Sequence, residues 1–173
     1  MSAARLHPDP DYGRFAKLWP AVRELQALAA GHGIHDIFQD NGGKILQVLL
    51  LLHLRRGDGR EGVDALDGSG NEYELKSVNR KLTKAFSTHH HLNLEVLANY
   101  RGVHAWYFAV YEHIELVAIY RVEPPALEPY FRKWEAKWRK RNPRGTLGGK
   151  QKDINNPKIP ISHVETVGER VYP

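Results

Sequence analysis

The chain has no cysteine and only one methionine in 173 residues. Without cysteine it has no disulfide bonds, no thiolate nucleophile and no zinc site of the cysteine type, which agrees with a reducing compartment. Long apolar runs are also lacking, because the longest, residues 45–52, includes Gln47 and is far shorter than the roughly 20 residues that span a bilayer. Residues 1–11 lack the apolar centre of a signal peptide. We therefore expect a cytoplasmic protein with no membrane partner.

Charge of one sign is in modest excess over the whole chain, with 25 basic and 20 acidic residues and a net charge of +5. Residues 132–152 alone carry a net charge of +8, so the rest of the chain is slightly acidic. A phosphate-rich partner would fit this basic segment, and so would an exposed helix end followed by a solvated loop. The segment has one acid, Glu135, and nine basic residues: Arg132, Lys133, Lys137, Arg139, Lys140, Arg141, Arg144, Lys150 and Lys152.

The length fits one compact domain, residues 1–173, and the chain shows no repeat or linker. Alternating polar and apolar residues predict two hairpins, one over 63–78 with a turn at 67–70 and one over 104–121. Apolar residues at helical spacing predict helices over 15–29, 44–54, 92–100 and 126–138. Together these elements predict an α/β (α+β) fold, with a central mixed β-sheet flanked by helices.

Two of the predicted helices have features of their own. Pro20 should kink or restart the first helix, which Gly31 and Gly33 should close. The second, residues 44–54, is apolar nearly all round, so we place it deep in the core. The apolar residues of the fourth are spaced as a packed face. Loops are expected over 55–62 and 139–151, residues 84–91 show no clear period, and a short extended tail ends the chain.

The first hairpin carries residues suited to phosphodiester hydrolysis. Asp64 and Glu74 lie on its two arms, and Lys76 lies two residues beyond Glu74, so both project from one face of the strand. If Asp64 points to that face too, two carboxylates and an ammonium group converge. The carboxylates could hold Mg²⁺, with the backbone carbonyl of Leu75 as a further ligand, while Lys76 orients or deprotonates the attacking water. Glu61 could bind a second metal or support the first.

The Glu-x-Lys pattern is short and occurs again at Glu135–Lys137. That copy falls on a predicted helix, where residues two apart point to different sides, so it predicts only solvent-exposed charge. Taken alone, the strand copy at Glu74–Lys76 also fits an ordinary exposed strand face. The catalytic interpretation therefore needs support from other parts of the chain.

A run of three histidines and a pair of asparagines supply that support. Adjacent residues on an extended chain point to opposite faces, so the run is poor geometry for a three-histidine metal site. Imidazole and asparagine side chains can instead bond base edges in the major groove of DNA. The structural alternatives are a polar loop for the histidines and an Asx turn before Pro157 for the asparagines. The histidine run is His89–His91, and the asparagines are Asn155 and Asn156.

These stretches together resemble the PvuII family of type II restriction endonucleases, within the PD-(D/E)xK nuclease superfamily. The resemblance runs from about Trp19 to Tyr172 and is carried by residues 37–44, 59–62, 72–77, 86–91 and 152–160. It implies a restriction-endonuclease-like fold and a homodimer that uses Mg²⁺ to cut double-stranded DNA. The implied target is the palindrome CAG/CTG, cut to blunt ends that carry a 5′-phosphate and a 3′-hydroxyl.

The resemblance also implies roles for individual residues. Asp64, Glu74 and Lys76 match the catalytic positions, with Glu61 and Tyr100 near them. Other matching residues would contact DNA: His90, His91, Asn155 and Asn156 in the major groove, Ser87 and Thr88 beside them, and Asp40 in the minor groove. The N-terminal helix would supply the dimer surface, and the genetic partner in the bacterial host would be a DNA methyltransferase.

The chain departs from the family pattern at three places. Val63 stands where the superfamily motif has proline, residues 55–58 differ, and the loop 139–150 is longer and more basic. The added charge should strengthen nonspecific phosphate binding more than base choice. Two rival hypotheses are a structure-directed repair or junction nuclease that does not read sequence, and a DNA-binding protein without catalysis. In the second, Glu74 and Lys76 would form an ordinary salt-bridged pair on the strand.

Overall fold

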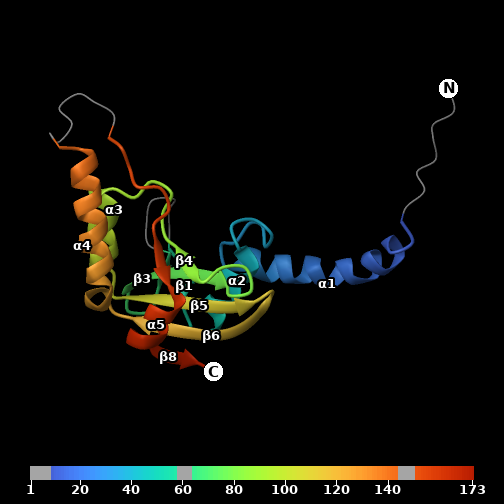
Figure 1. Ribbon diagram of the computed structural model, residues 1–173. Coiled ribbons are helices and arrows are strands. Elements are labelled where there is room, and N and C mark those ends of the chain that lie inside the picture. The colour runs from blue at the N-terminus through green and yellow to red at the C-terminus, as the bar shows by residue number, and fades with distance from the viewer. Residues whose placement is uncertain (1–8, 58–63, 144–150) are drawn as a thin grey trace. The chain divides into compact units, whose positions relative to one another are not determined.

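The computed structural model describes residues 9–57, 64–143 and 151–173 (Figure 1). The chain divides into two compact units, Met1–Gln47 and Val48–Pro173, and a single domain over 1–173 stays a prediction. The described residues form, in chain order, α1 (Tyr12–Gly31), α2 (Gly42–Leu51), β1 (Arg55–Arg56), β2 (Ala65–Leu66), β3 (Glu72–Asn79), β4 (Ala85–Ser87), α3 (Leu94–Gly102), β5 (Ala105–Glu112), β6 (Glu115–Val122), α4 (Pro124–Arg141), β7 (Lys158–Pro160), α5 (Ile161–Val167) and β8 (Glu169–Tyr172).

The first unit contains α1 and the loop that follows it. The helix continues through Pro20, which removes one backbone donor without restarting the helix, and it ends at Gly31 as the glycines predict. The Gln26 side chain fixes the loop, because its oxygen accepts from the Ile37 backbone N–H at 2.9 Å and its amide donates to the Ile34 carbonyl at 3.2 Å. The loop is therefore anchored to the helix by one side chain.

A tight turn leads from this loop into α2. Asp40 and Asn41 both have positive φ angles, of 49° and 62°, in the left-handed region that these two residue types tolerate. A Cβ atom on Gly42 would lie 2.4 Å from the Asp36 carbonyl oxygen, so only glycine fits there. The turn at 40–43 thus has a steric basis.

The second unit is built on a six-stranded sheet with the order β1-β2-β3-β5-β6-β8 (Figure 1). Strands β3 and β5 pair in parallel, and each of the other neighbouring pairs is antiparallel. The mixed sheet and both predicted hairpins are therefore confirmed. The parallel pair requires a crossover, and the chain makes it through β4 and α3.

The two faces of this sheet are covered differently. One face carries Trp106 and Phe108, which are fully buried in a large cluster with residues of α3, α4 and α5. The opposite face carries Tyr107, Ala109 and Tyr111, which pack with residues of the 48–52 segment and of β8. Period-two alternation along β5 thus divides the core into two layers.

The helices α3 and α4 lie side by side over the first face (Figure 1). The predicted packed face of α4 is confirmed, because Leu127, Phe131, Trp134 and Trp138 are all buried. The prediction that α2 is buried all round is wrong at its end, because Leu50 and Leu51 are each 42% exposed. A helix with apolar residues on every side is buried only where other elements pack against each side.

Other elements differ from the sequence prediction. Arg55–Arg56 form the edge strand β1 where a loop is predicted. Residues 85–87 and 158–160 form a separate two-stranded sheet, whose pairing the residue pattern does not indicate. The predicted extended tail is wrong over 161–167, which form the helix α5 between β7 and β8. Strands of three residues are too short to show a period, because their pairing partner decides their conformation. Among the described residues, no helix is both long and apolar enough to cross a membrane.

Candidate active site

The hairpin of β2 and β3 is held by a turn built on Asp67. Its Oδ1 accepts from the backbone N–H groups of Ser69 and Asn71 at 2.8 and 3.0 Å, and its Oδ2 accepts from the Tyr73 hydroxyl at 3.0 Å. The Asn71 side-chain bond is the main reason that the pKa of Asp67 falls to about 2. Gly70 closes the turn with φ +82°. The turn fixes the pairing register of the two arms.

That register brings Asp64 opposite Glu74. Ala65 pairs with Tyr73 and Leu66 with Glu72, so the next residue outward, Asp64, lies across from Glu74. The Asp64 carboxylate accepts from the Leu75 backbone N–H at 2.9 Å and lies 3.7 Å from the Lys76 ammonium. Glu74 forms an ion pair with the same ammonium group. The three predicted catalytic side chains therefore meet on one face of the hairpin.

Burial makes this cluster electrostatically unusual. Glu74 is 8% exposed and lies on the sheet face that also carries Trp106, its partner in the parallel ladder. Burial raises the pKa of Glu74, and the Lys76 ammonium only partly offsets this. Burial also acts to lower the pKa of Lys76, but the charges of Glu74 and Asp64 outweigh it and raise the pKa. The ammonium group is therefore charged at neutral pH.

Tyr100 reaches the same cluster from α3. Its ring centroid lies 5.9 Å from the Lys76 ammonium and 4.5 Å from the centroid of Trp106, with the two rings edge to face. The hydroxyl is buried and has no hydrogen-bond partner among the described residues. Burial raises the pKa of Tyr100, and the negative charges of Glu74 and Asp64 add to the rise. The cluster thus contains a buried polar atom that nothing in the described protein satisfies.

Two other predicted members of the catalytic site are Glu61 and the backbone carbonyl of Leu75. Glu61 lies outside the described residues. Leu75 contributes its backbone N–H to Asp64, and its carbonyl as a metal ligand stays a prediction. The second Glu-x-Lys copy falls on α4, where the predicted solvent exposure holds for Lys137 but not for Glu135, which is half-buried and binds Arg101.

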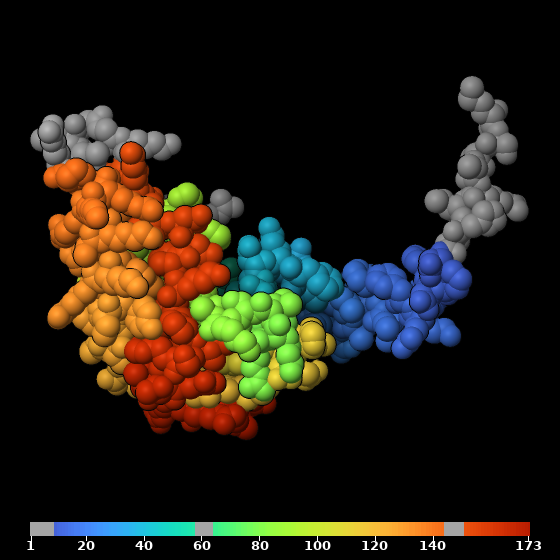
Figure 2. All heavy atoms as spheres, viewed as in Figure 1, coloured from blue at the N-terminus to red at the C-terminus, as the bar shows by residue number. Residues whose placement is uncertain are grey.

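The two predicted recognition segments, more than 60 residues apart in sequence, lie side by side. Strands β4 and β7 pair antiparallel, with Phe86 opposite Ile159 and Ser87 opposite Lys158. Phe86 and Ile159 are fully buried, whereas Ser87 and Lys158 point to solvent. Figure 2 shows the green segment that contains β4 against the red C-terminal segment. We call residues 85–92 and 152–160 together the paired platform.

Hydrogen bonds extend the pairing beyond the two short strands. The Thr88 hydroxyl and backbone N–H both donate to the Pro157 carbonyl, at 2.7 and 3.2 Å. The Asn156 backbone N–H donates to the His89 carbonyl at 2.9 Å. The Asn156 side-chain amide donates to the Ser87 hydroxyl at 3.3 Å. Ser87 and Thr88 thus position the asparagine pair.

The predicted base-contacting side chains lie on this platform. His90, His91 and Asn155 are exposed, and Asn156 is half-buried with φ 44°. The ring of His91 lies 3.9 Å from the Asp153 carboxylate. Asp40 belongs to the first unit, where it is exposed in the turn before α2. The structure therefore gathers the histidines and asparagines on one surface.

The sequence gives no sign of what anchors the platform to α4. The buried Asn142 side chain donates to the Trp138 carbonyl at 2.9 Å and to the Lys152 carbonyl at 3.3 Å, and it accepts from the Lys152 N–H at 3.0 Å. Arg141 donates to the Asp153 carbonyl at 3.0 Å. In the sequence, an Asn that follows a helix indicates only a helix cap. Its bonds to the backbone of Lys152 become visible only in the fold.

The fold and the cluster define a class of protein. A mixed sheet that presents two carboxylates and a lysine from one hairpin, beside a surface of histidines and amides, carries the types of group that metal-dependent hydrolysis and base readout use. A family model described as restriction endonuclease PvuII matches residues 10–172. The chain therefore belongs to the PvuII family of restriction endonucleases, which are type II site-specific deoxyribonucleases.

Proposed function

We propose that this restriction endonuclease hydrolyses phosphodiester bonds of double-stranded DNA with Asp64, Glu74 and Lys76 as its catalytic group and Mg²⁺ as cofactor. The observation that carries the proposal is the convergence of both carboxylates on the Lys76 ammonium, at 3.7 Å for Asp64 and in a direct ion pair for Glu74. Three charged groups meeting on a partly buried sheet face are costly to stability, which favours a functional reason for them.

The residues present fit a magnesium ion. The donors are carboxylate oxygens on neighbouring strands, which are hard ligands of the kind that Mg²⁺ prefers. Within the described ranges, no three acidic, histidine or cysteine side chains lie close enough together to hold a metal ion. Two carboxylates are enough for Mg²⁺, because this ion commonly retains several waters and needs few protein ligands. The unpartnered Tyr100 hydroxyl beside the cluster suits such a hydrated ion. When bound, the ion neutralises phosphate charge and lowers the pKa of a water ligand.

The side chains of the cluster have distinct proposed roles. Asp64 and Glu74 would hold the ion, with the carbonyl of Leu75 and with Glu61 as further candidates. The two carboxylates keep the pKa of Lys76 above its usual value, so we assign Lys76 as a fixed positive charge toward the scissile phosphate. Tyr100 lies against the Lys76 side chain and limits where that charge can move.

The paired platform is the proposed recognition surface. Exposed imidazoles and amides at His90, His91, Asn155 and Asn156 can pair with base edges, and hydrogen bonds across β4 and β7 fix their backbone. We propose the palindrome CAG/CTG as the target, cut to blunt ends with a 5′-phosphate and a 3′-hydroxyl. Asp40 is the proposed minor-groove contact, with Ser87 and Thr88 as supports of the platform.

A palindrome offers two equal half-sites, so we propose that the enzyme acts as a homodimer. Helix α1 supports this, because Ala29 is its only buried residue and Leu18 is 61% exposed. Apolar side chains left open along a helix mark a surface for a partner. Its exposed large apolar residues are Tyr12, Phe15, Leu18, Trp19, Leu25 and Leu28.

A substitution on α1 tests the dimer. Leu18→Glu should convert the protein from a dimer to a monomer in analytical ultracentrifugation and should abolish double-strand cleavage. An exposed position of the second unit, Ile114→Glu, is the matched control and should leave the dimer intact. A dimer that persists in Leu18→Glu, Leu25→Glu and the double variant would contradict this assignment.

The proposed setting follows from the activity. A nuclease that cuts a short palindrome would cut its host's own DNA, so we propose a DNA methyltransferase as the genetic partner, in the cytoplasm of a bacterium. Plasmid that has been treated with a methyltransferase specific for CAG/CTG should resist the enzyme, whereas untreated plasmid should be cut.

The cleavage test uses a plasmid with one CAG/CTG site, with and without Mg²⁺. We expect one linear product, blunt by end sequencing, only when Mg²⁺ is present. Glu74→Gln should lose this activity, whereas the matched control Glu72→Gln, an exposed residue on the same strand, should keep it. Smeared or branch-dependent products would support a structure-directed nuclease, and binding without any cleavage would overturn the catalytic assignment.

A further inference from the structure

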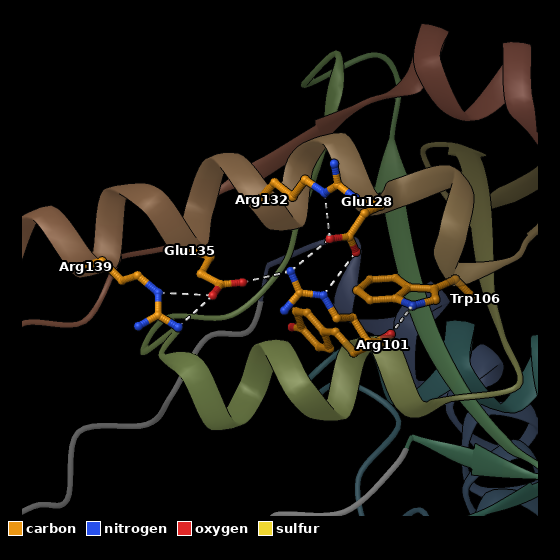
Figure 3. A network of polar contacts seen from close by, with 7 residues as sticks. Arg101, Trp106, Glu128, Arg132, Glu135 and Arg139 are labelled. Carbon is orange, nitrogen blue, oxygen red and sulfur yellow. Dashed lines mark hydrogen bonds and ion pairs between the residues drawn. The ribbon is translucent and has the colours of Figure 1, made fainter.

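Helix α4 carries two basic flanks, one on each side of its buried face, and they differ in how their charge is balanced. On the first flank, Arg132 binds Glu128 at 3.3 Å and Arg139 binds Glu135 at 2.8 Å. Both glutamates also bind Arg101 of α3, each at 3.0 Å (Figure 3). The positive charges of this flank are therefore largely neutralised by glutamates of the same helix.

The second flank carries Lys133, Lys137 and Lys140, which we call the lysine stripe. Their spacing of four and three residues places them on one side of the helix, and all three are exposed. No residue in the described part of the chain forms an ion pair or hydrogen bond with their ammonium groups. The stripe thus presents three uncompensated positive charges to solvent.

The lysine stripe ends next to the anchor of the paired platform. Arg141 and Asn142 follow Lys140 directly and bind the backbone of Lys152 and Asp153, where the platform begins. In Figure 2, the orange residues of α4 lie against the red segment that follows residue 151. The seven residue steps from Lys133 to Lys140 rise about 10 Å along the helix. That length corresponds to about three base-pair steps of duplex DNA.

We propose that the lysine stripe binds phosphates of the duplex that flanks the recognition site. This inference rests on the proposed function, because it takes DNA to be bound at the paired platform. An ammonium group binds phosphate as a point charge without demanding one geometry, which suits contacts that follow a backbone and do not read sequence. Charge complementarity and the neighbouring platform both favour DNA over an acidic protein as the partner.

The chain offers a closely matched comparison on the same helix. Lys133 and Lys140 are seven residues apart, as are Arg132 and Arg139, and each pair loses two positive charges when replaced by glutamine. Only the arginines are neutralised by carboxylates. If the lysine stripe contacts DNA, K133Q/K140Q should therefore weaken DNA binding more than R132Q/R139Q does. If only net charge matters, the two variants should weaken binding equally.

The experiment measures equilibrium binding of the full chain to duplex DNA in EDTA, over a range of KCl concentrations. One duplex has about 30 base pairs with the CAG/CTG site at its centre, and the other has about 12, too few for long flanks. On the long duplex, K133Q/K140Q should reduce the slope of log K against log salt by about 1 for each lysine removed from a contact. On the short duplex, the slope should match that of the unmodified protein.

The controls give each outcome a meaning. R132Q/R139Q should leave the slope on the long duplex nearly unchanged, and the charge-preserving K133R/K140R should restore it. Equal slopes for the two glutamine variants, or no change with either, would overturn the inference. Because K133Q/K140Q leaves Asp64, Glu74 and Lys76 untouched, it should still cut plasmid at one site with Mg²⁺. Failure of the unmodified protein to bind or cut the site would instead count against the proposed function.

Discussion

The unpartnered hydroxyl of Tyr100 leads to a prediction about stability. Leaving a buried polar group without a partner costs about 1–3 kcal/mol, so Tyr100→Phe should not lower the free energy of unfolding and should raise it by up to about 1 kcal/mol. The neighbours of the ring are kept, since its centroid lies 4.5 Å from that of Trp106, 6.2 Å from that of Phe131 and 5.9 Å from the Lys76 ammonium.

Tyr73→Phe is the matched control for this measurement. Tyr73 and Tyr100 are about equally buried, 6% and 4% exposed, but the Tyr73 hydroxyl donates to the Asp67 carboxylate at 3.0 Å. Urea denaturation should therefore show a lower midpoint for Tyr73→Phe and an unchanged or higher midpoint for Tyr100→Phe. A loss of stability in Tyr100→Phe as large as in Tyr73→Phe would refute the reasoning.

The same variant separates stability from function. If the hydroxyl serves the hydrated ion, Tyr100→Phe should cut the plasmid site more slowly while its unfolding free energy is maintained. Tyr100→Ala would not make this distinction, because removing a buried aromatic ring typically costs about 3–5 kcal/mol.

Three further predictions concern the framework around the site. Arg101→Met should lower the free energy of unfolding at pH 7 by about 1–2 kcal/mol, since it removes charged hydrogen bonds to two partly exposed glutamates of α4. Hydrogen bonds from Arg101 and α4 arginines lower the folded pKa values of these glutamates, so the difference in stability is complete above about pH 4.5. It should shrink as the pH falls below that value and the glutamates take up protons, and a difference that does not shrink in acid would contradict the ion-pair explanation. Asp67→Ala should lower the thermal midpoint and slow cleavage, because the turn sets the register of the catalytic hairpin, and Asp67→Asn should be milder; equal midpoints would exclude this role. Gly42→Ala should cost about 2 kcal/mol, because the new Cβ meets the Asp36 carbonyl, whereas Gly13→Ala has open space and should be tolerated in the same denaturation assay; similar costs would contradict the steric argument.

The sequence was sufficient to predict the hairpin of β2 and β3, because its pattern is local. The turn at 67–70 and the alternation along 72–78 both depend on residues close in the chain, so the register that places Asp64 across from Glu74 follows from the turn. The aromatic face of α4 was predictable for the same reason, since one helix period contains the whole signal.

Features that depend on distant residues could not be predicted in this way. The pairing of Ser87 with Lys158 and the bond from Thr88 to the Pro157 carbonyl join segments about 70 residues apart, and neither segment shows a period alone. Asn142 accepts a hydrogen bond from the backbone of Lys152, but the residue types between them predict only a loop. The resemblance to the family indicated that the histidines and asparagines act together, but the hydrogen bonds that bring them together emerge only from the fold.

The measurement that tests the central claim most directly is single-turnover cleavage of the one-site plasmid by Asp64→Ala in Mg²⁺, alongside its binding to the site in EDTA. We expect the cleavage rate to fall by about a thousandfold or more, because the variant loses a proposed ligand of the ion. Its binding in EDTA should stay close to that of the unmodified protein, since the paired platform is intact. Cleavage near the unmodified rate by a folded, DNA-binding Asp64→Ala would contradict the assignment of the catalytic centre.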